Sequence, residues 1–116
     1  MFENQKRWRL LRDIKKGKFC FLIGVDNWSI ELQKSEFDSL YFLLKRINEQ
    51  LLDIKNQLMD EEFITLELEQ LPWHIELEGK KNEWSLRFVF ESQDQTRSFE
   101  MYWPIPIAQN LFYEIK

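Results

Sequence analysis

Residues 36–59 constrain the fold of this chain most, because their apolar side chains recur at intervals of three or four. That spacing places one apolar face along an α-helix, formed by Phe37, Leu40, Tyr41, Leu44, Ile47, Leu51, Ile54 and Leu58. The helix would be roughly 36 Å long at about 1.5 Å per residue. Another layer of the protein must cover so wide an apolar face.

The two ends of this helix carry different signals. Ser35, with Asp38 three residues later, resembles a capping box and predicts that the helix begins there. Asp60, Glu61 and Glu62 follow the other end, where the helix dipole disfavours acidic groups. They are either solvated or paired internally, with the basic 6–18 segment as the internal partner, or they form a partner surface or a divalent cation site. The first interpretation is favoured, because a hard cation needs several converging oxygen ligands.

Alternation of apolar and polar residues predicts β-strands on both sides of the helix. The expected strands are 8–13, 19–25 and 28–33 before it, and 64–69, 73–78, 84–91 and 99–103 after it. Asp26-Asn27 and residues 79–82 supply turns, and a short helix over 107–115 follows two prolines. The expected fold class is therefore α+β, with antiparallel sheet in the order β-β-β-α-β-β-β-β-α. All five tryptophans fall on inward positions of these strands.

The length of 116 residues is typical of a single domain. Within it, a shift of 69 residues aligns Lys18–Phe21 with Arg87–Phe90 and Ser29–Leu32 with Ser98–Met101. Each half would end in a helix. The sequence therefore suggests an internal repeat of 8–60 and 63–116, although any two amphipathic strands align about this well.

The composition favours a soluble protein of a reducing cytoplasm. The one cysteine, Cys20, lies in an apolar run and cannot form an intramolecular disulfide. The N-terminus lacks the apolar stretch of a secretory signal, and no run approaches the about 20 residues of a membrane span.

Signatures of enzymes are absent from the sequence. The one histidine, His74, is expected on the outer face of a strand beside Glu76 and Glu78, as a surface residue. No Gly-rich phosphate loop occurs, and the count of Cys and His excludes structural zinc. We therefore expect no catalytic residues, no metal and no cofactor.

Charge is distributed unevenly along the chain. Residues 1–18 hold only two acidic residues against seven basic ones. The basic residues are Lys6, Arg7, Arg9, Arg12, Lys15, Lys16 and Lys18. This basic segment could bind phosphate or the protein's own acidic surface, and the second is favoured because that surface is covalently attached. The later strands place Glu67, Glu69, Glu76, Glu78, Glu91 and Glu100 outward against Arg87, and so acidic a face repels nucleic acid.

Several segments together resemble a family of short cyanobacterial proteins of unknown function. They are Arg7–Leu10, Leu22–Leu32, Leu58–Glu62, Glu83–Phe88 and Tyr102–Pro104. Arg7, Val25 and residues 99–102 depart from glycines of the family pattern. The resemblance implies a fold similar to the Whirly plant proteins and the positive cofactor four coactivator domain, which bind single-stranded DNA, and it strengthens the expectation of a repeat. It implies no functional residues.

Taken together, the sequence favours a non-enzymatic, cytoplasmic interaction module that binds another protein. A single-stranded nucleic-acid binder that uses the basic 6–18 segment is the alternative, and a small-ligand binder or enzyme is third. Self-association is favoured slightly, because open sheet edges need cover.

Overall fold

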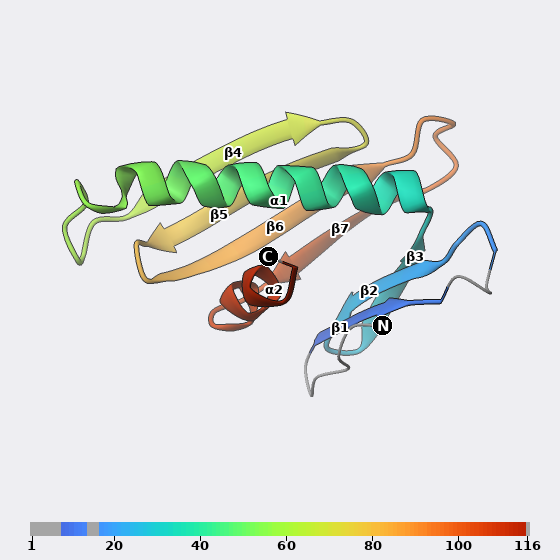
Figure 1. The fold of residues 1–116 in the computed structure, drawn as a ribbon, viewed down its shortest axis with the longest axis horizontal. Coiled ribbons are helices and arrows are strands. Elements are labelled where there is room, and N and C mark those ends of the chain that lie inside the picture. Colours follow the sequence, from blue (N-terminus) through green and yellow to red (C-terminus); the bar gives the residue numbers. More distant parts are fainter. Residues whose placement is uncertain (1–7, 14–16, 116) are drawn as a thin grey trace. The chain divides into compact units, whose positions relative to one another are not determined.

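The computed structural model describes residues 8–13 and 17–115 and confirms the predicted α+β class and element order (Figure 1). The elements are β1 (Trp8–Arg12), β2 (Phe21–Val25), β3 (Trp28–Leu32), α1 (Lys34–Lys55), β4 (Ile64–Gln70), β5 (Trp73–Lys80), β6 (Glu83–Glu91), β7 (Ser98–Trp103) and α2 (Ile107–Ile115). They divide into two compact units, Met1–Asp38 and Ser39–Lys116.

The first unit holds an antiparallel sheet in the order β1-β2-β3. Val25 pairs with Trp28 across the two-residue turn Asp26-Asn27, as predicted, and Asp26 has a φ of 54°. Leu10, Ile23 and Leu32 are fully buried. The ring of Phe21 stacks on Phe37 of α1 with centroids 4.1 Å apart.

Helix α1 begins at Lys34, earlier than the start that the sequence predicted at Ser35. The backbone N–H of Phe37 donates to Gln33 O at 3.0 Å, and the Gln33 N–H donates to Glu36 Oε1 at 2.8 Å. Gln33 is therefore the N-cap, and Glu36 reaches back to it as the third residue of a capping box does. The prediction that the helix starts at Ser35 was wrong, because the buried Glu36 satisfies the cap two residues upstream.

The helix also ends earlier than the predicted residue 59. Its last residue is Lys55, after which Gln57 N–H donates to Ile54 O and Leu58 N–H donates to Lys55 O. These i to i+3 bonds tighten the final turn and redirect the chain. The apolar face continued in the sequence, but Leu58 is half-buried in the connection rather than in the helix.

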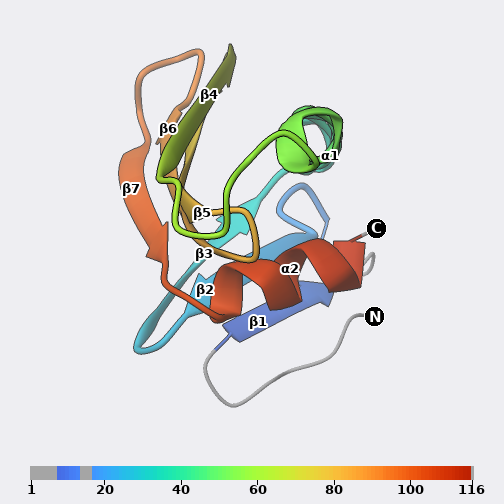
Figure 2. The ribbon, with the colours of Figure 1, turned by 90° about the vertical axis from the view of Figure 1, so that its left-hand side faces the viewer.

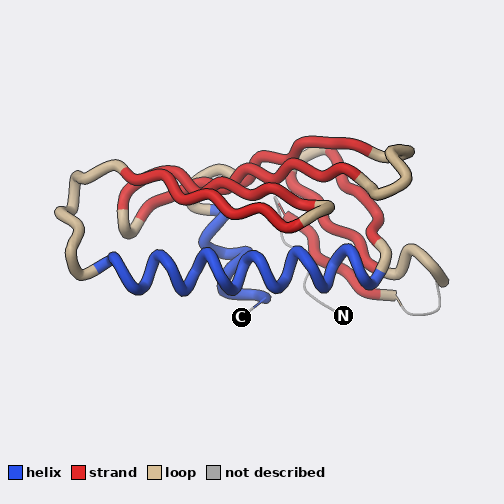
Figure 3. The backbone as a smooth tube through the Cα atoms, turned by 90° about the horizontal axis from the view of Figure 1, so that it is seen from above, coloured by secondary structure: helices blue, strands red, loops and turns tan. Residues whose placement is uncertain are grey.

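The second unit is a four-stranded antiparallel meander, β4-β5-β6-β7, covered on one face by α1 from residue 39 onward. Figure 3 shows the helix as a separate layer along the sheet. Leu40, Leu43, Leu44, Ile47 and Leu51 of α1 are buried, and Leu43 was missing from the predicted stripe. The sheet contributes buried residues at every second position of β5 and most of β6.

Helix α2 contacts β6 at the end of the same unit, and Figure 2 shows α1 and α2 on the same side of the four-stranded sheet. Ile107, Ala108 and Leu111 are buried, and the ring of Phe112 lies 4.5 Å from that of Trp84. The sheet, α1 and α2 thus share one core. Trp73, Trp84 and Trp103 lie in it, as predicted, whereas the side chains of Trp8 and Trp28 are outside the described part of the chain.

The predicted duplication stays a prediction. The shift of 69 residues moves β3 onto 97–101, nearly all of which belongs to β7. The same shift moves β2 onto 90–94, which is mostly the turn between β6 and β7. In the described residues, no helix is long and apolar enough to span a membrane.

Gly79 lies in β5 opposite Trp84, next to the last pair of the β5–β6 hairpin, and has a φ of 146°; a Cβ there would collide with Glu83 O and lie 2.7 Å from Trp84 Cα. We expect Gly79→Ala to lower the free energy of unfolding by about 2–3 kcal/mol, because the backbone must move. Gly17→Ala is the control, since Gly17 has a φ of 83° but nothing within 4 Å, and it should cost about 1 kcal/mol. Equal losses in urea denaturation would contradict the steric argument.

Asp94 organises the turn between β6 and β7. Its Oδ1 accepts hydrogen bonds from Thr96 Oγ1 at 2.7 Å, Ser92 Oγ at 2.8 Å and Thr96 N–H at 3.1 Å. Those bonds, led by the Thr96 hydroxyl, lower the pKa of Asp94 to about 2.

A lowered pKa in the folded state means that Asp94 stabilises the fold above its unfolded pKa of about 3.9 and that this contribution is lost as pH falls towards 2. We expect Asp94→Asn to be less stable than wild type at pH 7, with the difference shrinking between pH 4 and pH 2. Urea midpoints measured at pH 7, 3.5 and 2.5 check this. A difference that stays constant across these values would show that the carboxylate charge is irrelevant.

Candidate functional site

The structure describes three members of the predicted basic segment, Arg9, Arg12 and Lys18; Lys6, Arg7, Lys15 and Lys16 lie outside the described residues. The Arg9 guanidinium donates to Asp26 O at 3.0 Å. The Arg12 guanidinium lies 5.7 Å from the centre of the Phe21 ring. Because Arg9 and Arg12 are three positions apart in β1, they point to opposite faces of the sheet. Phosphate binding by this segment remains an untested prediction.

Asp60, Glu61 and Glu62 follow α1 at a distance of several residues, so the helix dipole disfavours them less than expected. Asp60 Oδ1 lies 3.0 Å from Lys81 Nζ, and Glu61 Oε2 lies 2.6 Å from Lys80 Nζ. The bond to Glu61 raises the pKa of Lys80. Lys80 is the last residue of β5 and Lys81 begins the β5–β6 turn, and the sequence had indicated only a turn for both. A partner or cation surface at these exposed acids stays a prediction.

The outer face of the four-stranded sheet is acidic, as the alternation predicted. Arg87 lies near its centre, with its guanidinium 3.2 Å from Glu100 and 3.6 Å from Glu76. The hydrogen bond to Glu100 and the charge of Glu76 raise the pKa of Arg87. His74 also lies on this face, half-buried, with Nδ1 3.5 Å from Glu69 Oε2.

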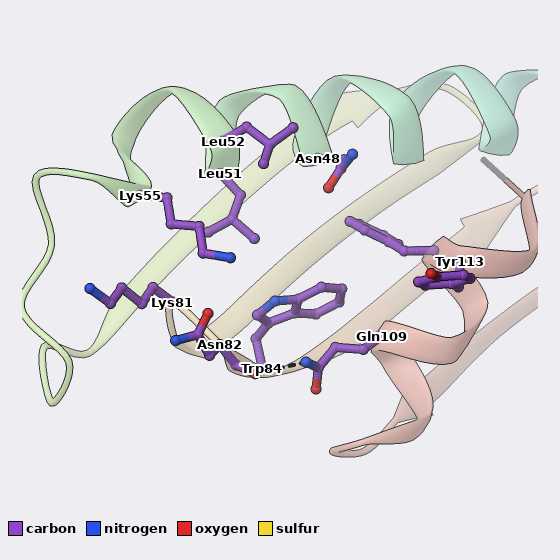
Figure 4. A pocket seen from close by; sticks show the side chains of 10 residues that line it. Asn48, Leu51, Leu52, Lys55, Lys81, Asn82, Trp84, Gln109 and Tyr113 are labelled. Carbon is purple, nitrogen blue, oxygen red and sulfur yellow. Dashed lines mark hydrogen bonds between the residues drawn. The ribbon is translucent and has the colours of Figure 1, made fainter.

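A small pocket opens between the last turns of α1, the β5–β6 turn and α2 (Figure 4). Its volume is about 200 Å³. It is lined by Asn48, Leu51, Leu52, Lys55, Lys81, Asn82, Trp84, Gln109, Phe112 and Tyr113. All of these residues belong to the second unit.

The pocket has an apolar floor and a mixed rim. Leu51 and Trp84 are buried, and the indole of Trp84 packs against Phe112. Leu52 and Tyr113 are large apolar side chains left 55% and 86% exposed at the edge. So much exposed apolar surface beside a concavity is typical of a binding site.

Amides and two lysines complete the rim. Gln109 Nε2 donates to Asn82 O at 2.7 Å, which ties α2 to the β5–β6 turn. Lys81 Nζ donates to Leu58 O at 3.1 Å and pairs with Asp60, whereas Lys55 has no ion pair among the described residues. The pocket therefore combines a buried aromatic wall with a positively charged side.

Sequence reasoning did not find this pocket, because its residues come from three segments far apart in the chain. Trp84 was assigned correctly to the core, and Leu51 to the helix stripe. Leu52 was a usable signal, since it is a large apolar residue on the polar side of the predicted helix.

Residues 3–116 match the family described as "Domain of unknown function (DUF1818)". The chain is also similar to the crystal structure of a protein of unknown function from the DUF155 family of Prochlorococcus sp. NATL2A, with a TM-score of 0.91 and 35% sequence identity. That match covers 99% of this chain and 95% of the other. Among curated proteins, none matches. The resemblance to a family of unknown function is thereby confirmed, and the likeness to Whirly proteins stays a prediction.

The contacts of Lys81 predict that this lysine holds the 56–63 connection beside the pocket. We expect Lys81→Ala to lower the free energy of unfolding by about 1.5 kcal/mol, because a charged hydrogen bond to the Leu58 carbonyl is lost. Lys80→Ala is the matched control and should change the melting temperature little, because its pair with Glu61 is exposed. If both variants melt like wild type, the lysine does not anchor the connection.

Proposed function

The chain belongs to this family of unknown function, and from that premise we propose that it is a non-enzymatic interaction module. It binds another protein by accepting an apolar side chain, flanked by acidic residues, in the pocket between α1, the β5–β6 turn and α2. The observation that carries the proposal is the exposure of Leu52 and Tyr113 around a floor that contains Trp84.

The size of the pocket favours a side chain over a separate small molecule. Sites for drug-sized ligands usually enclose about 300–1,000 Å³, and this pocket has about 200 Å³. Protein interfaces, by contrast, are commonly anchored by one aromatic or aliphatic residue inserted into a small pocket. The dimensions thus suit an anchor residue of a partner chain.

The distribution of polarity around the pocket also matches a protein interface. Such interfaces have an apolar centre and a polar rim that excludes water. Here Leu51, Trp84 and Phe112 supply the centre, and the amides of Asn48, Asn82 and Gln109 supply part of the rim. An inserted side chain would therefore lose water contacts while neighbouring backbone groups find hydrogen-bond partners.

Charge indicates the chemistry of the partner. Lys55 and Lys81 both line the pocket, and Asp60 neutralises part of the charge of Lys81 alone. A partner with carboxylates beside its apolar anchor would complement the Lys55 side. Such complementary charges speed association and disfavour a partner of the wrong charge.

A reducing, cytoplasmic setting suits this function, because it keeps Cys20 as a thiol. The neighbour from Prochlorococcus favours a cyanobacterial origin. The second candidate is single-stranded nucleic acid, supported by the basic 6–18 segment and the expected Whirly-like architecture. That candidate predicts binding at the 6–18 segment instead of the pocket, and a separate arm of the experiment tests it.

Two blocked pentapeptides test the proposal by amide NMR titration of the full chain. Each has a central tryptophan, flanked on both sides by two glutamates in one peptide and by two lysines in the other. We expect the glutamate peptide to shift signals of the pocket residues and to bind more tightly than the lysine peptide, because Lys55 attracts carboxylates. Equal affinities for the two peptides, or shifts confined to residues outside the pocket, would contradict the proposal.

Leu52→Glu should weaken binding of the glutamate peptide by roughly tenfold, or about 1.4 kcal/mol, because the substitution removes an apolar rim contact and adds a negative charge. Met59→Glu is the matched control, since Met59 is 76% exposed and does not line the pocket. An unlabelled thymidine oligonucleotide in low salt forms a third arm. If it binds through the 6–18 segment while neither peptide binds, the nucleic-acid candidate replaces the protein-binding one.

A further inference from the structure

The outer face of β4 and β5 brings three metal-ligating side chains together. Glu67 of β4 and His74 and Glu76 of β5 each offer one ligand atom, and these atoms all lie within 4.8 Å of one another. We propose that Glu67, His74 and Glu76 bind one Zn²⁺ ion. The site lies on the sheet and shares no residue with the pocket lining.

Strand register creates this cluster. Glu67 pairs directly with Glu76 across the β4–β5 ladder, and His74 precedes Glu76 by two positions on the same face. Figure 1 shows the two strands side by side in the second unit. Because both strands belong to a hydrogen-bonded sheet, the three Cα positions are held without help from a flexible loop.

The spacing suits a metal after small side-chain rotations. Zinc binds nitrogen and oxygen ligands at about 2.0–2.2 Å, so neighbouring ligand atoms in a tetrahedral site lie roughly 3.4 Å apart. The present separations are within 4.8 Å. Closing the difference takes rotation about glutamate side-chain bonds and no movement of the strands.

The electrostatics of the cluster also favour a cation. Like charges directly opposite in a sheet destabilise it, and Glu67 and Glu76 are such a pair. Arg87 offsets part of the charge of Glu76 at 3.6 Å, but it also serves Glu100 at 3.2 Å. Glu67 has no ion pair within residues 8–13 and 17–115. A divalent ion would neutralise both opposed carboxylates together.

The imidazole favours zinc over magnesium and calcium. Magnesium and calcium prefer oxygen ligands, whereas one imidazole with carboxylates suits zinc. Glu69, directly opposite His74 and 3.5 Å from its Nδ1, provides a carboxylate of the sort that orients metal-bound histidines. The count of Cys and His in the sequence excluded structural zinc, but that count omitted carboxylates supplied by a neighbouring strand.

The experiment is a titration of the chelator-treated full chain with ZnCl₂, followed by calorimetry and by NMR of the imidazole. His74 is the one histidine in the sequence, so its ring signals report the site without ambiguity. We expect one Zn²⁺ per chain, a shift of the His74 signals, and no comparable shift with MgCl₂.

Glu67→Gln and His74→Gln should each weaken Zn²⁺ binding by at least about tenfold. Glu78→Gln is the control, because it removes the same charge from the same face outside the cluster. Glu67→Gln should also raise the melting temperature of the metal-free protein, since it relieves the opposed charges, and this readout shows that the variant is folded.

The proposal is overturned if Zn²⁺ leaves the His74 signals unmoved, or if His74→Gln binds as tightly as wild type. It is equally overturned if Glu78→Gln loses as much affinity as Glu67→Gln, because that result would indicate a general attraction of the acidic face. Binding that depends on Cys20, revealed by a Cys20→Ser variant, would place the ion elsewhere and reject the assignment.

Discussion

The packing of the apolar face of α1 on the inner face of the β4–β7 sheet is the interaction on which the second unit depends. Leu40, Leu43 and Ile47 are fully buried there, and truncation of such residues typically costs about 2–5 kcal/mol each. The pocket is a consequence of this packing. One helix covers part of the sheet, α2 covers a neighbouring part, and the space between their ends remains as a concavity over Trp84 (Figure 4).

Most of the fold could be predicted from sequence periodicity. A period near 3.6 located α1, and a period of two located seven strands in the right order, because each pattern reflects one buried face. The two ends of α1 were harder to predict from the sequence. Glu36 caps the helix from inside its first turn, and the apolar stripe continues through Leu58 after the hydrogen-bonding pattern has changed at Lys55. Neither event alters the periodicity.

The candidate sites were less predictable for a different reason. The pocket depends on the relative placement of three segments, and the Glu67–His74–Glu76 cluster depends on strand register, which alternation alone does not determine. The residue types of both sites can be read in the sequence, but which of these residues lie next to one another is known only from the pairing of the strands and the packing of the helices. The lysine partners of Asp60 and Glu61 illustrate the same limit, because Lys80 and Lys81 had been interpreted simply as a turn.

Strand β4 lies at the edge of its sheet, with Ile64, Leu66 and Leu68 half-buried and Glu67 and Glu69 on the opposite side. An uncovered edge of this kind can recruit a second copy of itself and start aggregation. In an antiparallel pairing of two such edges, the glutamates of one copy would lie close to those of the other. Repulsion between these glutamates would disfavour such a pairing, as gatekeeper residues beside apolar strands do.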